Sequence, residues 1–367
     1  GNYQANAGIT VPYSGADIEM HREARITINN TDAVGFLSIT GDRVTLRGGM
    51  ILKTSYTADQ ILVKFANCRD AIVRDTTFDV LFNSLADAST DGVVTAVAAP
   101  TGSTSTPMIM LDFDTVLRKR VDGCNFLPDY ATTCLRSTDG SALNITYCHF
   151  ANDVEAGLGG ISLDTGPVVV YAENPAPRLC WRAIQIDGDE WGTIAGCRFF
   201  GLGDSNYAST PYYTSAPYEL DFVVRIKRGT SVPTGSFATS QSEGGHFVFI
   251  NNRVEWCAAP KAIKIWGAGS THIFGNMFGL NNSANAANEA MLVITGADGT
   301  STGTETGNIV INGNDFHNSA FTGTDAGAID LERVDEAMIT GNKFTVVAST
   351  RAITLKAGTC KRPHISG

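Results

Sequence analysis

The chain has 367 residues, of which 43% are apolar and 17% are charged, and its formal net charge is −10. This composition supports a large buried core and excludes intrinsic disorder, and no apolar run reaches the ~18 residues of a membrane span. Because no apolar run is long enough, we expect no membrane insertion. An acidic surface repels phosphate backbones, so we also expect no nucleic-acid partner.

The sequence contains no motif for a metal or a cofactor. None of the eight cysteines forms a CxxC pair, and the six histidines show neither HxH nor i, i+4 spacing. The glycine-rich stretches lack the phosphate-loop pattern, and no GxSxG nucleophile elbow is present. We therefore expect no cofactor.

A repeat runs along most of the chain. Nine eight-residue segments share one pattern: 44–51, 71–78, 119–126, 143–150, 192–199, 247–254, 271–278, 309–316 and 337–344. Their last residue is Phe in seven and aliphatic in two, and the residue five places earlier is always apolar, from Leu46 to Ile339. The shortest spacing between segments is 24 residues, which is the length of one coil of a solenoid.

A second apolar pair precedes many of these segments at a nearly constant distance, as Val63 and Phe65 or Ile263 and Ile265 do. Both patterns alternate with period two, as half-buried strands do. Strands of identical phase bury their apolar faces only by stacking in parallel, with like residues above like. The repeat therefore predicts an all-β protein, a right-handed parallel β-helix with lateral loop insertions.

Two residues before each terminal Phe stands a small, polar or thiol residue, which is Asn in four late segments and Cys in three earlier ones. Asn252, Asn276, Asn314 and Asn342 are predicted to stack as an internal hydrogen-bonded ladder. Cys124, Cys148 and Cys197 are interpreted as buried free thiols in the same ladder and not as disulfides or metal ligands.

The pattern predicts two regions, an N-terminal capping segment (1–35) and the β-helix (36–367). At the C-terminal end, residues 351–355 restart a first strand and 364–367 begin another segment that stops before its Phe. We therefore expect the β-helix to be cut at this end and covered by a missing segment or a neighbouring chain.

Long excursions are expected after the Phe strand at 79–107, 151–182, 200–221 and 279–290, and between the apolar pairs at 228–245 and 296–307. Several are rich in tyrosine, including Tyr212 and Tyr213. Loops held on one side of a rigid scaffold are typical binding elements, and tyrosine offers a flat surface for sugar rings or for protein. Tolerated surface insertions are the alternative.

Charged residues fill the outward positions of the first strands. The position within each apolar pair includes Lys64, Asp112, Arg136, Gln185, Arg225, Lys264 and Asp330, and the position after it includes Asp114, Asp187, Lys227, Trp266 and Glu332. We call these residues the charged strip. A groove for a polar polymer would need such a strip, and an ordinary solvent face with stacked salt bridges is the alternative.

The coils ending in GN-x-F, the Cys/Asn ladder, the tyrosine-rich loops and the missing closure together resemble the pectate-lyase-like β-helix superfamily, and among its members the tailspike depolymerases of bacteriophages. This resemblance covers about residues 36–367. It implies a homotrimer in the virion, at the phage tail, that acts outside the cell and binds and cleaves bacterial capsule or O-antigen. The aspartate run that binds Ca²⁺ in pectate lyases has no match here.

The predicted activity is hydrolysis of a glycosidic bond, which needs one protonated carboxyl group and one carboxylate. Asp114 and Asp187 share a phase and would lie about two strand spacings apart if 151–182 is a lateral loop. If that segment hides an extra coil, Asp187 with Asp189 or Glu190 is the better pair. Substrate binding is assigned to Arg225, Lys227, Lys264, Trp266, Tyr212 and Tyr213. The alternatives are a non-catalytic receptor-binding spike and a polysaccharide lyase in which Lys227 or Arg225 is the base.

Overall fold

The computed structural model contains 33 β-strands and, in the part of the chain that it describes, no helix and hence none able to span a membrane. The described residues are 1–54, 57, 59–80, 108–128, 132–151, 180–188, 191–200, 202, 222–227, 246–255, 261–266, 270–279, 291–295, 308–320, 328–332, 334, 336–347, 352–355, 360 and 362–367.

The strands form three sheets of 11 strands, and every strand pair is parallel. Sheet A holds β1 (Asn2–Ala5), β4 (Arg25–Ile28), β7 (Met50–Lys53), β10 (Thr77–Val80), β13 (Asn125–Leu127), β16 (His149–Ala151), β19 (Arg198–Phe200), β22 (Arg253–Glu255), β25 (Met277–Gly279), β28 (Asp315–Ala320) and β31 (Lys343–Val347). Sheet B holds β2 (Ile9–Val11), β5 (Val34–Ile39), β8 (Ile61–Ala66), β11 (Met108–Asp114), β14 (Thr132–Thr138), β17 (Cys180–Asp187), β20 (Phe222–Lys227), β23 (Lys261–Trp266), β26 (Leu292–Thr295), β29 (Ile329–Glu332) and β32 (Ile353–Leu355). Sheet C holds β3 (Asp17–Glu19), β6 (Val44–Arg47), β9 (Asp70–Arg74), β12 (Arg118–Asp122), β15 (Ala142–Thr146), β18 (Trp191–Ala195), β21 (His246–Ile250), β24 (Ser270–Phe274), β27 (Ile309–Asn312), β30 (Ala337–Thr340) and β33 (Pro363–Ser366).

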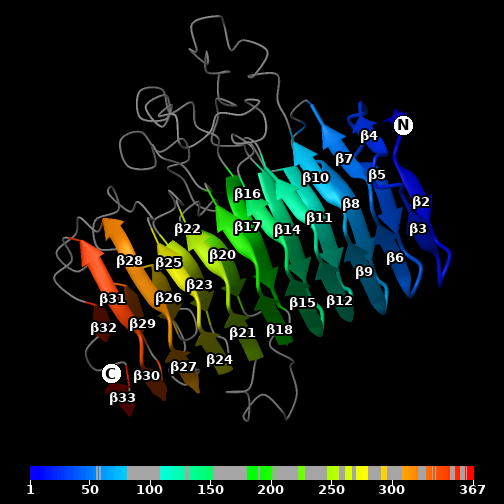
Figure 1. Ribbon diagram of the computed structural model, residues 1–367. Coiled ribbons are helices and arrows are strands. Elements are labelled where there is room, and N and C mark those ends of the chain that lie inside the picture. The colour runs from blue at the N-terminus through cyan, green and yellow to red at the C-terminus, as the bar shows by residue number, and fades with distance from the viewer. Residues whose placement is uncertain are drawn as a thin grey trace, which may run out of the picture.

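Each coil runs through sheet B, then sheet C, then sheet A, and the next coil repeats this order. Figure 1 shows the coils stacked along one axis, with the N-terminal coils at one end and the C-terminal coils at the other. Connections between parallel strands of one sheet are right-handed in about 98% of cases. The fold is a right-handed parallel β-helix, as the repeat predicted.

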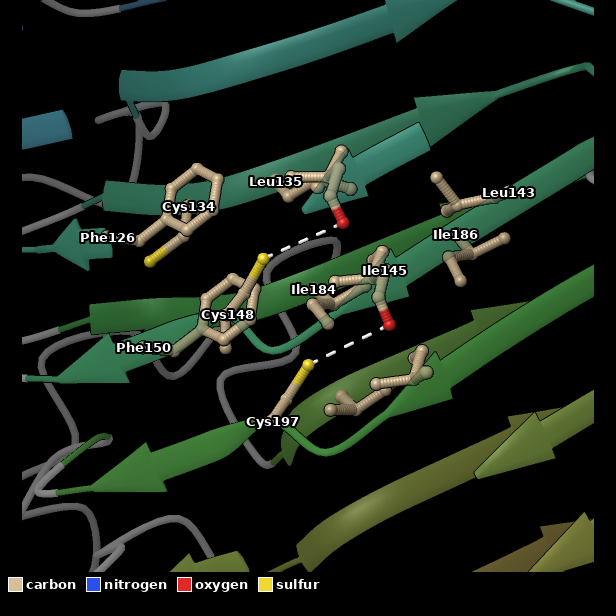
Figure 2. Packing of buried hydrophobic residues seen from close by; sticks show 14 of the residues in the cluster. Phe126, Cys134, Leu135, Leu143, Ile145, Cys148, Phe150, Ile184, Ile186 and Cys197 are labelled. Atoms are coloured by element: carbon tan, nitrogen blue, oxygen red, sulfur yellow. Dashed lines mark hydrogen bonds between the residues drawn. The ribbon is translucent and has the colours of Figure 1, made fainter. Parts of the chain in front are cut away.

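The core is built from columns of identical phase. The predicted inward column from Leu46 to Ile339 is in register on consecutive strands of sheet C, and each member is at most 3% exposed. In sheet A the terminal phenylalanines stack face to face, with ring centroids 4.8 Å apart for Phe126 and Phe150 and 4.9 Å for Phe150 and Phe199. Figure 2 shows Phe126 and Phe150 of this stack beside the aliphatic columns. The apolar periodicity thus sets the register.

The turn between sheets C and A is the same in successive coils. Its first residue has positive φ, a conformation that glycine adopts freely and that Asp75, Tyr147 and Asn251 also adopt here. The ladder residue follows it. The backbone N–H of Asn276 donates to Oδ1 of Asn314 at 2.9 Å, and the Asn314 amide donates to the carbonyl of Ile273 at 2.9 Å. The asparagine ladder is confirmed.

The cysteines of the ladder are free and buried, also as predicted. Cys148 lies 3.8 Å from the carbonyl oxygen of Val121, and Cys197 stands equally far from that of Ile145 (Figure 2). A hydrogen bond with Cys148, together with burial, raises the pKa of Cys124 well above its usual value. The Cys124 thiol therefore stays protonated, and a protonated thiol is inert as a nucleophile.

The predicted boundary at residue 35 does not separate two folds. Strands β1 to β4 belong to the three sheets, and Ile18 pairs with Leu46 and Ile26 with Ile51 in the same register as later coils. The segment expected to be only a cap is therefore the first coil. Its pattern is weak because β1, β2 and β3 each have a strand on one side only and expose most of their residues.

The structure also decides between the two interpretations of 151–182. Strand β14 pairs directly with β17, so no coil is hidden between them. Two predicted excursions overlap strands. Cys180, at the end of 151–182, belongs to β17, and strand β10 (Thr77–Val80) overlaps the start of 79–107. Most of the predicted excursions, including 81–107, 152–179, 203–221, 228–245, 280–290 and 296–307, lie outside the described residues.

We predict that Asn314→Ala destabilises the β-helix by about 2–6 kcal/mol. The substitution leaves the buried N–H of Asn276 and the carbonyl of Ile273 without partners, and each such loss costs about 1–3 kcal/mol. Urea unfolding measures the change. Asn312→Ala, at an exposed outward position of β27, is the control and should stay within about 0.5 kcal/mol of the parent. Equal effects for the two variants would refute the energetic role of the ladder.

Candidate functional site

The charged strip runs along the outer face of sheet B. Lys64, Asp112, Arg136, Gln185, Arg225 and Lys264 are in register on six consecutive strands, from β8 to β23. A second column two residues further along contains Asp114, Thr138, Asp187, Lys227, Trp266 and Glu332, with Thr295 between the last two. The predicted phase of these residues is therefore correct.

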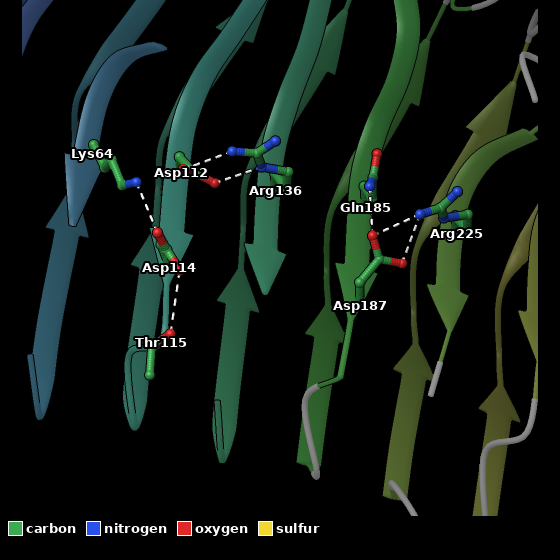
Figure 3. Close-up of polar contacts among 8 residues, drawn as sticks. All are labelled: Lys64, Asp112, Asp114, Thr115, Arg136, Gln185, Asp187 and Arg225. Carbon is green, nitrogen blue, oxygen red and sulfur yellow. Dashed lines mark hydrogen bonds and ion pairs between the residues drawn. The ribbon is translucent and has the colours of Figure 1, made fainter. Parts of the chain in front are cut away.

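The acids and bases of neighbouring coils form ion pairs (Figure 3). Lys64 Nζ lies 2.8 Å from Asp114 Oδ2. Arg136 binds Asp112 with two parallel hydrogen bonds, from Nε at 2.7 Å and Nη2 at 2.9 Å. Asp112 is fully buried, so this carboxylate, expected on an open face, serves as the counter-ion of Arg136 and is closed to solvent.

Asp187 has a different environment at the next coil. Arg225 Nη2 contacts both of its carboxylate oxygens, at 2.7 and 2.6 Å, and Gln185 Nε2 donates to Oδ2 at 2.5 Å. The Asp187 side chain is still 24% exposed and that of Arg225 13% exposed. Arg225 and Gln185 thus hold the partly accessible carboxylate of Asp187 in a fixed orientation (Figure 3).

Asp114 and Asp187 are two coils apart, because Thr138 pairs with both of them in the sheet. Two strand spacings of ~4.8 Å separate their backbones by about 9.6 Å. In inverting glycosidases the two carboxyl groups are roughly 6.5–9.5 Å apart. The backbone separation of Asp114 and Asp187 is therefore close to the upper limit of the carboxyl separations found in inverting enzymes.

The protonation state favours one role for Asp114. The hydrogen bond from Lys64 and the charge of that ammonium lower the pKa of Asp114 below its usual value. Asp114 is therefore a carboxylate at neutral pH and suits the base of a hydrolysis, not the acid. Asp112 and Asp187 are also held by cations, so Asp112, Asp114 and Asp187 of the charged strip are all ion-paired.

The remaining predicted site residues are placed only in part. Lys264 is half-buried on β23, next to Arg225 in the register. Lys227 and Trp266 lie on β20 and β23 in the column of Asp187, but their side chains are outside the description. Asp189, Glu190, Tyr212 and Tyr213 lie outside the described residues altogether. Among the described side chains, no group of three His, Cys, Asp or Glu residues could hold a metal ion.

Sequence reasoning missed a second feature, on the outer face of sheet C. A depression of about 230 Å³ lies over β15, β18, β21 and β24, with Trp191, His246 and His272 among its lining residues. Trp191 and His246 are in register, and their rings stack with centroids 4.4 Å apart. The signal was available, because both residues occupy the same phase of the repeat at the start of the strand that carries the inward column.

The three parallel sheets define the class of this protein as a right-handed parallel β-helix. The comparisons with solved structures include a tailspike protein. The chain is similar to the Dettilon tailspike protein, known from a crystal structure, with 12% sequence identity and a TM-score of 0.49. The match covers 99% of this chain and 61% of that one, so the chain spans about three fifths of its length. No family model and no curated protein matches the sequence.

We predict that Lys64→Met raises the pKa of Asp114 toward the ordinary value of an aspartate, because the ammonium no longer stabilises the carboxylate. A carboxylate with a lowered folded-state pKa stabilises the protein above its unfolded-state pKa, and this contribution is lost as the pH falls through the folded-state value. The stability difference between parent and Lys64→Met should therefore vanish in acid.

Carboxyl NMR titration of Asp114 and urea unfolding at several pH values measure these effects. Lys64→Arg, which keeps the positive charge, is the control and should leave the pKa of Asp114 low. An Asp114 titration that is the same in parent and Lys64→Met would contradict the assigned cause.

Proposed function

We propose that this chain is the β-helical body of a tailspike-like protein that binds a bacterial surface polysaccharide, capsule or O-antigen, and hydrolyses its glycosidic bonds. The observation that supports this proposal best is the charged strip on sheet B. It presents acids and bases at a regular spacing along a rigid scaffold, with Asp187 fixed yet accessible. A linear polar polymer is a ligand that fits such a repeating surface.

Binding is assigned to the C-terminal part of the strip. Arg225 and Lys264 are neighbouring cations on sheet B, and Lys227 belongs to the next column. Guanidinium and ammonium groups recognise carboxylates, so a polymer with acidic sugars is the proposed substrate class. Trp266, Tyr212 and Tyr213 remain proposed stacking residues for sugar rings.

Hydrolysis needs a carboxylate for the water and a protonated group for the leaving oxygen. Asp114, with its lowered pKa, is proposed as the carboxylate. Asp187 is proposed as the proton donor, because Arg225 holds its carboxyl group in place while the side chain remains 24% exposed. Asp189 and Glu190, which follow Asp187 in the chain, are the other proposed proton donors.

A second candidate function is non-catalytic attachment to the same polysaccharide. The specific observation in its favour is that Asp114 and Asp187 are both ion-paired, as on a structural charged face. Lyase chemistry is supported less well for Arg225, since a guanidinium does not release its proton in proteins and this one is engaged by Asp187.

One experiment separates these activities. The protein is incubated with a panel of bacterial capsule and O-antigen polysaccharides, and reducing ends and ultraviolet absorbance are followed together. Reducing ends alone indicate hydrolysis. Both signals indicate a lyase, which leaves an unsaturated product, and binding without either signal indicates an adhesin.

We predict that Asp187→Asn lowers the rate of cleavage at least about 100-fold on a polysaccharide that the parent cleaves, because the amide cannot transfer the proton. Asp70→Asn is the matched control, since Asp70 also pairs with an arginine of the next coil, Arg118, but on sheet C. It should keep full activity. Full activity of Asp187→Asn would refute the site assignment even if hydrolysis is the reaction.

The proposal includes a phage-tail location in the virion, outside the host cell, and a parallel homotrimer. We predict that multi-angle light scattering at micromolar concentration gives a mass three times that of the 38.9 kDa chain. Dilution and salt series on the same sample serve as controls for non-specific association. A monodisperse monomer would contradict the trimer.

A further inference from the structure

The depression on sheet C is lined by side chains from four consecutive strands. The first outward column is Ala142, Trp191, His246 and Ser270, and the column two residues along is Asn144, Thr193, Val248 and His272. These eight residues, which we call the sheet C depression, share no member with the charged strip.

The centre of the depression is an exposed aromatic platform. Trp191 is 53% exposed, and one side of its indole stacks on His246 with an interplanar angle of 30°. On the other side of Trp191 in the register lies Ala142, which carries only a methyl group. The stack holds the indole in place, and its exposed surface is available to a flat ligand.

The packing below the surface accounts for this arrangement. Gly192 occupies an inward position between Leu143 and Phe247, and a Cβ there would lie 2.5 Å from the Phe247 ring. The large ring of one coil thus fills the interior space that the glycine leaves free. Strand β18, which carries Trp191, is therefore fixed by the core contact between Gly192 and Phe247, and this contact leaves no room for a side chain at residue 192.

The polar groups around the platform are hydroxyl, amide and imidazole groups. Ser270 Oγ lies 3.4 Å from His272 Nε2, while in the described part of the chain Asn144 and Thr193 make no side-chain hydrogen bond. Among the residues that the structure describes, no Lys, Arg, Asp or Glu lines the depression. Hydroxyl and amide groups beside an apolar ring suit a ligand with hydroxyl groups on one side and C–H groups on another, which describes a pyranose.

We propose that the sheet C depression is a second carbohydrate-binding site, which takes one neutral pyranose ring, a hexose or an N-acetylhexosamine. Its volume of about 230 Å³ is below the roughly 300 Å³ at which pockets for larger ligands begin, which favours a single ring. The choice of a sugar rests on the proposed function. The site itself is independent of the charged strip and selects neutral in place of acidic sugars.

The alternative to a sugar site is a contact between subunits, because apolar side chains continue along the outer face of sheet C at Phe274, Val310 and the exposed Met338. The hollow at Trp191 and the unengaged polar groups of Asn144 and Thr193 favour the sugar. A tightly packed protein contact would instead leave these polar groups buried without partners.

Ligand-observed NMR tests the proposal with methyl glucoside, methyl galactoside, N-acetylglucosamine and glucuronic acid as probes. We expect at least one neutral probe to bind and glucuronic acid not to compete with it. Trp191→Ala should weaken this binding at least about tenfold, and Asn144→Ala, which leaves the platform intact, about threefold. Tyr147→Ala is the control, because Tyr147 is 75% exposed and lies outside the depression.

Two measurements distinguish failure of this inference from failure of the proposed function. Asp187→Asn should keep pyranose binding whether or not the parent cleaves a polysaccharide. If no neutral probe binds, or if Trp191→Ala leaves the binding unchanged, the second site is refuted even where cleavage is observed. A Trp191→Ala variant that loses its oligomeric state by light scattering but binds sugar like the parent would assign the face to a subunit contact and overturn the proposal.

Discussion

The structure depends on one constraint, that each residue lies directly above its equivalent in the next coil. Parallel strands ~4.8 Å apart bring identical phases into contact, so an apolar residue must meet an apolar one and a polar group must find a partner in the coil above or below. The phenylalanine stack and the asparagine ladder are the two solutions to this constraint in the interior. The stack gains from face-to-face aromatic contact. In the ladder, a backbone N–H donates to the asparagine side chain of the next coil, and the side-chain amide also donates to a backbone carbonyl of the preceding coil.

The same constraint governs the outer face of sheet B. Charges at one phase are brought within a few ångströms of those on the next coil, where unpaired like charges would repel. Asp112 under Arg136, and Asp187 beside Arg225, relieve this by pairing across coils. The ion pair with Arg225 stabilises the coil and also occupies the Asp187 carboxylate. An acidic group of a ligand that bound Arg225 would have to compete with Asp187 for the guanidinium.

The outer faces of sheets B and C differ in the chemistry that they present. Sheet B carries fixed charges, whereas the middle of sheet C carries an aromatic platform with neutral polar groups. A solenoid can keep such surfaces apart because each sheet receives its own residue of every coil. The proposed recognition of acidic sugars on one face and neutral sugars on the other would use this division, and it would raise the apparent affinity for a long polysaccharide that reaches both faces.

The periodicity of the sequence alone determined the coil, the inward column from Leu46 to Ile339, the ladder and the phase of the charged strip, because a period-two pattern repeated at coil length has only one way to bury its apolar face. It did not extend to the first coil, whose strands have a single neighbour and a correspondingly weak pattern. The tertiary structure alone decided that β14 lies beside β17, that Asp112 is buried, that Arg225 reaches Asp187 and that Trp191 rests on His246. Phase specifies which direction a side chain leaves the strand, but the partner it meets depends on which coils are adjacent, and long insertions hide that adjacency from the sequence.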